Sequence, residues 1–379
     1  MIETASSPAG RPQAAEADWR LAIPEAHRRP FRAWFWSLAA MTFAVLVIGG
    51  ITRLTQSGLS MVDWQPIMGV IPPLTDAQWQ ETFDRYRQFP EYQVLRRGMS
   101  LDEFKFIFFW EYLHRMVART IGLVFLVPFV FFWAKGWFTR PLAVRAMVLF
   151  GLGAMQGVMG WFMVMSGLVD RPSVSHYRLA AHLSLAFIIF GYALWLARDL
   201  AIGARGRAGT VASAGSRRLL LRGLTLIGAI MAVQIVWGAF VAGLKAGLYF
   251  NTFPLMGGRL VPPNVLGLDP APLNFVQNPI TVQWVHRVVG TVLAVAAIAF
   301  FVQVLREAAD NVSRRLNVAL LAGIVTQYVL GVLTLLYRVP VSLGVIHQGT
   351  AMIVFGVWLW WLHHASNLDT SITGGVPAR

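Results

Sequence analysis

Long apolar runs alternate with shorter polar segments along the whole chain. Eight of these runs approach the length of about 20 residues that an α-helix needs to cross a hydrocarbon core about 30 Å thick. The runs cover residues 33–51, 107–134, 143–165, 178–197, 223–243, 281–305, 316–336 and 342–362. The pattern therefore predicts an all-α polytopic membrane protein with eight transmembrane helices.

Composition and charge agree with a membrane protein and suggest its orientation. Of the 379 residues, 56% are hydrophobic and only 13% are charged, which is too apolar for a soluble protein of this length. Lys and Arg concentrate in the segments on the same side as both termini, so the positive-inside rule predicts cytoplasmic termini in a bacterial inner membrane. The alternative is a mitochondrial inner membrane with the termini in the matrix. A basic, lipid-facing side explains the net charge of +14 without a nucleic acid partner.

The two halves of the chain repeat one pattern. SGLSMVDWQPIMGVIPP (57–73) is similar to AGLYFNTFPLMGGRLVPP (246–263), and WEYLHRMV (110–117) matches VQWVHRVV (282–289). AMQGVMG (154–160) then matches VTQYVLG (325–331), and LAAHLSLAF (179–187) matches GVIHQGTAM (344–352). Because each repeat holds four helices, the halves are expected as two four-helix bundles related by a pseudo-two-fold axis along the membrane normal.

This repeat divides the chain into five parts. We expect a cytoplasmic N-terminal tail, since the first residues lack the apolar core of a signal peptide. Two bundles follow, joined by a basic cytoplasmic linker and closed by a cytoplasmic tail. The expected ranges are 1–32, 33–200, 201–222, 223–363 and 364–379, in that order.

Four of the eight histidines recur at matched places in the repeat. They are His114, His182, His286 and His347, each near the outer end of an even-numbered helix. Haem iron takes one imidazole on each face, whereas zinc needs three or four ligands converging on a point, so two histidines per bundle favour two haem sites. The alternative for each histidine is a hydrogen bond across a helix interface. The remaining four lie in or beside the tails or in an outer loop: His27, His176, His363 and His364.

The chain contains no cysteine, which excludes disulfides, thiolate metal sites and covalent haem attachment. Arg115 and Arg287 directly follow two of the histidines and are candidate partners for haem propionates. Snorkelling to lipid phosphate is the alternative. Arg53 and Arg119 admit the same two interpretations.

One difference separates the two histidine motifs. Glu111 precedes His114 by three residues, whereas Gln283 holds that place before His286. Residues at i and i+3 share a helix face, so Glu111 is a candidate proton acceptor beside His114. The alternative is a local ion pair with Arg115 at i+4. The hypothesis is that the N-terminal bundle carries out chemistry while the C-terminal bundle holds a permanent cofactor.

Several stretches resemble the haem A synthase family over about residues 30–365. They are GGITRLTQSGLSMVDWQPIMGVIPPLT, EFKFIFFWEYLHR, VAGLKAGLYFNTFPLMGG, QWVHR and VIHQG. The resemblance implies that haem O is oxidised at its C8 methyl group to the formyl group of haem A, for use in cytochrome oxidase assembly.

The resemblance also implies roles for individual residues. His114 and His182 would hold haem O, Glu111 would matter for activity, and His286 and His347 would ligate a haem b that relays electrons. Haem O synthase and cytochrome oxidase assembly factors are the implied partners, beside the lipid bilayer and an electron acceptor of unknown identity. The sequence is also compatible with a homo-oligomer.

Two other functions fit parts of the pattern. A di-haem b-type membrane cytochrome that only transfers electrons would explain four histidines, but it does not require the difference between Glu111 and Gln283. A transporter with parallel repeats would place polar groups at the membrane midplane, whereas here they cluster at one end. The outer segment 74–104 has a helical pattern and is open to use as a lid, a docking surface or packing.

Overall fold

A computed structural model describes residues 19–20, 22–61, 70–168, 173–202, 209–211, 213–307 and 310–369. Within these residues, eight helices are long and apolar enough to cross a membrane, as predicted. The first half holds α1 (Glu25–Leu54), α4 (Leu101–Ala134), α5 (Arg140–Leu168) and α6 (His176–Ile202). The second half holds α7 (Ala214–Gly243), α9 (Pro279–Arg306), α10 (Asn311–Leu336) and α11 (Val341–Ser366).

These helices extend further than the apolar runs, and polar caps define the ends of several of them. The hydroxyl of Ser100 accepts from the backbone N–H of Glu103 in a capping box that starts α4. The side chains of Ser213 and Asp310 accept from backbone N–H groups at the starts of α7 and α10. Helix α7 begins inside the expected linker 201–222, and α11 continues past residue 363, where Asn367 donates to the carbonyl of His363. Helix α1 begins inside the expected tail 1–32 without a side-chain cap.

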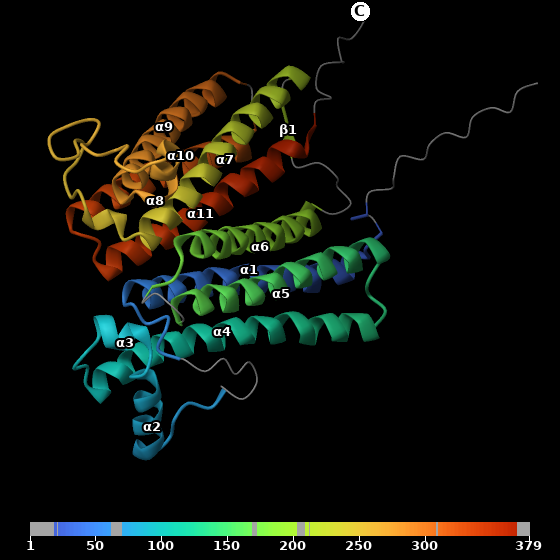
Figure 1. Ribbon diagram of the computed structural model, residues 1–379. Helices are drawn as coiled ribbons and strands as arrows, with labels where there is room; N and C mark the ends of the chain where they lie inside the picture. The colour runs from blue at the N-terminus through green and yellow to red at the C-terminus, as the bar shows by residue number, and fades with distance from the viewer. Residues whose placement is uncertain are drawn as a thin grey trace, which may run out of the picture.

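Short elements lie mostly at one end of the long helices, which we call the loop end (Figure 1). Helices α2 (Asp76–Tyr86) and α3 (Pro90–Leu95) occupy the segment 74–104, and their aromatic side chains pack on α4 around Phe104 and Phe108. The second half has η3 (Ala246–Leu248), η4 (Ala271–Leu273) and α8 (Asn274–Gln277). At the opposite end, β1 (Gly209–Thr210) pairs in parallel with β2 (Leu368–Asp369).

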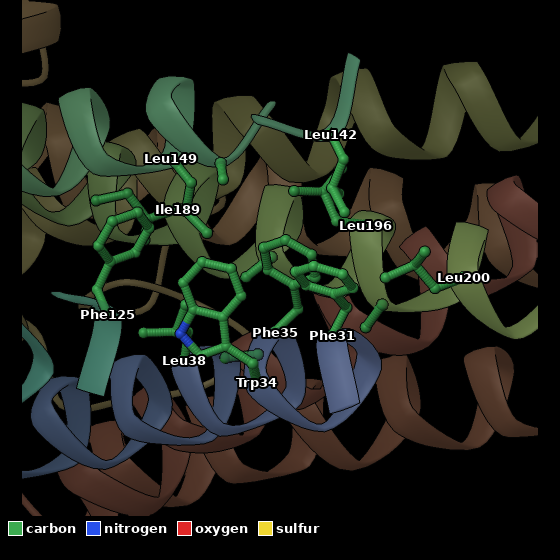
Figure 2. Packing of buried hydrophobic residues seen from close by; sticks show 14 of the residues in the cluster. Phe31, Trp34, Phe35, Leu38, Phe125, Leu142, Leu149, Ile189, Leu196 and Leu200 are labelled. Atoms are coloured by element: carbon green, nitrogen blue, oxygen red, sulfur yellow. The ribbon is translucent and has the colours of Figure 1, made fainter. Parts of the chain in front are cut away.

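Each half has its own apolar core, and both cores lie away from the loop end. In the first half, aromatic residues of α1 pack on α4, α5 and α6, with Trp34 and Phe125 ring centroids 5.1 Å apart (Figure 2). In the second half the core surrounds Trp361, which is fully buried. The four repeated histidines lie outside these two cores, in the loop-end half of each bundle.

Helices α6 and α11 join the halves through reciprocal contacts. A Cβ on Gly191 would lie 3.0 Å from the Phe355 ring, and a Cβ on Gly356 would lie 3.2 Å from the Phe190 ring. These four residues correspond pairwise in the repeat. A two-fold relation would produce such contacts, which favours the pseudo-two-fold axis that the repeat predicts.

Candidate functional site

The four repeated histidines lie in the loop-end half of the two bundles, on α4, α6, α9 and α11. All four side chains are half-buried. The His114 side chain lies near that of His182, and the His286 side chain lies near that of His347. The fold therefore brings the histidines together in pairs within each half.

A glycine on the preceding transmembrane helix faces each imidazole. A Cβ on Gly49 would lie 3.1 Å from Nε2 of His114, and a Cβ on Gly238 would lie 3.1 Å from Cε1 of His286. Gly160 and Gly331 approach the Cε1 atoms of His182 and His347 at 3.3 and 3.0 Å. Contacts this short leave little room for any larger residue. The sequence did not indicate these four glycines, because they meet the histidines only when the helices pack together.

Three of the imidazoles also contact a glutamine. The amide nitrogens of Gln156, Gln234 and Gln327 lie 3.3, 3.4 and 3.4 Å from Nε2 of His182, His286 and His347. Gln156 and Gln327 also donate to the backbone carbonyls of their histidines, at 3.1 and 2.9 Å. The same three imidazoles have a buried Nδ1 without a hydrogen-bond partner.

This arrangement fits ligation of haem iron. Each half offers two imidazoles from different helices, and three of the four imidazoles have a ring nitrogen without a protein partner. Haem iron can take one such imidazole on each face. Within the described residues, no group of three or more His, Cys, Asp or Glu side chains could hold a metal ion. His114 with His182, and His286 with His347, are the residues that would hold a haem group.

Glu111 is almost fully buried, with 2% of its surface exposed, and both carboxylate oxygens are engaged. Oε2 accepts from the hydroxyl of Ser60 and from the backbone N–H of Met61, both at 2.7 Å. Oε1 accepts from the guanidinium of Arg115, which also donates to the carbonyl of Met61 at 2.9 Å. The ion pair considered as the alternative is therefore present, and Glu111 holds the loop end of α1 against α4.

The second half contains a corresponding arrangement without the carboxylate. Gln283 donates to the carbonyl of Phe250 at 3.0 Å, and Arg287 donates to the same carbonyl at 2.7 Å. Phe250 corresponds to Met61 in the repeat. Both halves thus use a residue pair to hold the same loop position, but only the first uses a group that accepts a proton.

The arginine contacts are more structural than the sequence indicated. Arg115 and Arg287 hold loop backbone, although Nε of Arg287 is buried without a hydrogen-bond partner and fits a propionate. Arg53 donates to the carbonyls of Ala242 and Gly243 at 3.1 and 3.2 Å. It therefore caps the end of α7 and joins the two halves, a contact between distant segments that the local sequence does not signal.

Three acidic and histidine residues outside the repeat were missed or set aside. His363 and His364 are buried, with Nε2 atoms 2.9 Å from Asp199 and 3.1 Å from Asp310. Glu91 of α3 is 4% exposed and accepts from the hydroxyl of Tyr86 at 3.2 Å. His363 pairs with Asp199 and His364 with Asp310, and these partners lie far away in the sequence. The local sequence pattern therefore gave no sign of either contact.

The two halves differ in how the second and third of their helices meet. In the second half α10 packs along α9, and the hydroxyls of Thr291 and Tyr328 lie 3.1 Å apart. In the first half the corresponding residues are Arg119 and Gly157, and a Cβ on Gly157 would meet nothing within 4 Å. The same holds for Gly122 of α4 and Gly153 of α5. The side of the first half between α4 and α5 is therefore more open near its histidines.

Comparison with known proteins identifies the relatives of this chain. The family model described as cytochrome oxidase assembly protein matches residues 32–359. A haem A synthase of Rhodospirillum centenum is 45% identical over 96% of this chain and 93% of its own length. Haem A synthases of Nitrosospira multiformis and Parvibaculum lavamentivorans are each 44% identical over 89% of this chain, and 93% and 95% of their own lengths are covered. The chain therefore belongs to the haem A synthase family of cytochrome oxidase assembly proteins.

Proposed function

We propose that this protein is a haem A synthase that oxidises the C8 methyl group of haem O to the formyl group of haem A. Haem O is the substrate and lies in the first half between His114 and His182. A haem b cofactor lies in the second half between His286 and His347. The observation that carries this division is Glu111, a buried carboxylate one turn from His114, where the second half has Gln283.

Glu111 is the residue that takes a proton in this proposal. Oxidation of a methyl group releases protons and electrons, so the site needs a base and an electron route. Haem b, when bound, supplies the one-electron transfer. A carboxylate offers about four acceptor positions, and Ser60, Met61 and Arg115 use three, which leaves room for a proton from the reacting group.

The unequal packing of the two halves supports the same division. Haem O must enter and haem A must leave, whereas a cofactor should stay bound. The first half is open between α4 and α5, where Gly153 and Gly157 are exposed. The second half has buried Ile324 and half-buried Tyr328 at these positions. Exchange of a large apolar ligand is easier through the open side.

Replacement of Glu111 tests the catalytic role. We expect Glu111→Gln to lower haem A formation by about 10²-fold or more, the usual contribution of a positioned acid or base. The measurement is haem extraction and chromatography after co-expression with a haem O synthase. Gln283→Glu is the matched control and should leave haem A formation within about twofold. Near-normal haem A from Glu111→Gln would refute the proposal for Glu111.

Histidine variants test the assignment of the two haems. His286→Ala or His347→Ala should lose bound haem b, whereas His114→Ala should retain it. Pyridine haemochrome spectra of the purified variants give the haem b content. Equal loss from variants of both halves would contradict the division of labour.

A di-haem electron-transfer cytochrome is the second candidate, and the four paired histidines favour it equally. It predicts haem b in both halves and no haem A. Pigment extraction after co-expression with haem O synthase separates the two functions, because only a haem A synthase then yields haem O and haem A.

The proposal extends to location and partners. The chain would lie in a bacterial inner membrane with both termini cytoplasmic, receive haem O from a haem O synthase and deliver haem A to cytochrome oxidase assembly factors. Alkaline phosphatase fused after residue 379 should be inactive, and the same enzyme inserted after residue 98 should be active. The reverse pattern would contradict this orientation.

A further inference from the structure

The glycines that face the four histidines share a sequence pattern that is broken once. Residues 156–160 (QGVMG), 234–238 (QIVWG) and 327–331 (QYVLG) each place a glutamine four residues before the glycine. Residues 45–49 (VLVIG) place Val45 there instead. One helical turn separates the two positions, so both face the same imidazole. The exception is Val45 in the first half, one turn from Gly49, which faces His114.

The three glutamines hold their histidines in place. Their amide nitrogens contact the imidazoles at 3.3–3.4 Å, and two of them also donate to the histidine backbone on the neighbouring helix. An imidazole that binds iron through one ring nitrogen carries its proton on the other. With iron on Nδ1, which has no partner here, Nε2 would donate that proton to the glutamine Oε1, which has no partner either, once the amide is turned. Val45 has no side-chain donor or acceptor, so it provides no such partner for His114.

The exchange of glutamine for valine is accompanied by a change in the facing helix. A Cβ on Gly290 would lie 3.0 Å from the amide nitrogen of Gln234, so Gln234 needs the glycine. The residue of the first half that corresponds to Gly290 is Ala118. The smaller Val45 thus goes with the larger Ala118.

The His114 ring also lies differently from the other three. It turns Nε2 toward Gly49, whereas the others turn Cε1 toward their glycines. The first half therefore has its own packing at this place, and the ring without a glutamine takes a different orientation.

We propose that Gln156, Gln234 and Gln327 are positioning residues that keep their imidazoles on haem iron, and that Val45 makes His114 the one exchangeable ligand. This inference rests on the proposed function, which places haem O between His114 and His182. Residues that orient a ligand imidazole raise its affinity for the metal, and their loss typically weakens it 10–100-fold. An exogenous ligand would therefore replace the imidazole of His114 before any other, on the face of the haem that carries Glu111.

Carbon monoxide binding by the reduced protein tests this inference. Purified full-length protein is loaded with haem O, reduced with dithionite and titrated with carbon monoxide, which replaces a weakly held imidazole. The absorption bands of haem O and haem b are followed separately. We expect the haem O of the wild type to bind carbon monoxide at least about tenfold more tightly than the haem b.

Paired variants separate the hydrogen bond from side-chain bulk. Val45→Gln with Ala118→Gly transfers the arrangement of the second half and should weaken carbon monoxide binding to haem O about tenfold, which equals about 1.4 kcal/mol. Val45→Met with Ala118→Gly has similar bulk without the amide and should give the same carbon monoxide affinity as the wild type. Gln234→Val with Gly290→Ala should allow carbon monoxide to bind the second-half haem.

The outcomes distinguish this inference from the proposed function. Equal carbon monoxide binding by both haems of the wild type, or equal effects of the Gln and Met variants, would overturn the inference even if haem A is made. Failure of the first half to take up haem O would overturn it as well. Tight and selective binding without haem A formation would instead support the inference and contradict the enzymatic proposal. Haem b content shows that the variants of Val45 and Ala118 have folded, and thermal unfolding provides this control for Gln234→Val with Gly290→Ala.

Discussion

At the scale of single residues, the two histidine motifs share an arginine that holds a loop carbonyl but differ in the residue one turn before it. Arg115 and Arg287 hold corresponding loop carbonyls, and Glu111 and Gln283 stand one turn before them. Glutamine has the shape of glutamate, but Gln283 donates a hydrogen bond where Glu111 accepts, and an amide cannot take up a proton. Comparison of the two halves therefore separates two roles. Both Glu111 and Gln283 fix the loop, but only Glu111 can also take up a proton.

Glu91 is a second buried carboxyl group, and it lies outside the transmembrane segments. Burial raises its pKa from the ordinary 4.5 to about 7, although nearby Arg96 opposes the shift. Because the folded-state pKa is the higher one, the folded protein binds more protons than the unfolded chain between these values. The contribution of Glu91 to stability should therefore be greatest below pH 4.5 and be lost as the pH rises through about 7.

Glu91→Gln should remove this dependence, since glutamine stays neutral and keeps an acceptor for Tyr86. We expect the variant to gain about 2 kcal/mol relative to wild type between pH 5.5 and pH 8. Thermal unfolding in detergent at the two pH values measures it. A constant difference between variant and wild type across this range would show that Glu91 does not titrate there.

At the scale of elements, glycines decide where the helices approach closely. On α7, a Cβ at Gly228 would lie 2.2 Å from the indole of Trp358, whose Nε1 donates to the carbonyl of Leu224 at 2.8 Å. The anchored indole has little freedom to move aside. On α5, by contrast, Gly157 faces open space. The same residue type thus serves close packing in one helix and openness in another.

Alanine at these two positions should have opposite effects. Gly228→Ala should destabilise the protein by about 1–3 kcal/mol, the usual cost of overpacking. Gly157→Ala adds no clash and should be neutral, or stabilising by up to about 1 kcal/mol through helix propensity. Unfolding temperatures of the two variants provide the comparison. A loss of stability in Gly157→Ala would mean that α5 is closely packed at this position.

At the scale of the whole molecule, a terminal clasp joins the halves at the end opposite the loops. We define it as Arg20, Asp199, His363 and Asn367. Asp199 of α6 lies 2.9 Å from His363 of α11 and 3.6 Å from Arg20, which donates to Asn367 at 3.0 Å. His363 is fully buried, so its polar atoms have few other partners.

Asp199→Asn should weaken the clasp without touching the haem sites. We expect a loss on the order of 1–3 kcal/mol, as for other buried polar groups that lose a partner. Asp84→Asn breaks an exposed pair with Arg87 and should change stability by less than about 1 kcal/mol. Thermal unfolding measures both, and haem b content at low temperature should be equal. Equal stability of the two variants would refute the clasp.

Much of the fold follows from local signals in the sequence. Eight apolar runs predicted eight helices, since a membrane helix satisfies its own backbone and needs only length and apolarity. The repeat predicted which histidines pair, and the cap residues explain why the helices are longer than the apolar runs. Local signals failed for His363 and His364, which we assigned to the tail region although the structure buries both against aspartates.

What the sequence alone determined is the number of helices, the matched depth of His114, His182, His286 and His347, and the single carboxylate at Glu111. Only the tertiary structure decided that each histidine faces a glycine, that three also meet a glutamine, and that the first half is open between α4 and α5. The reason is physical: helix formation depends on neighbours in sequence, whereas contacts between helices depend on side chains that meet only after the bundle has packed.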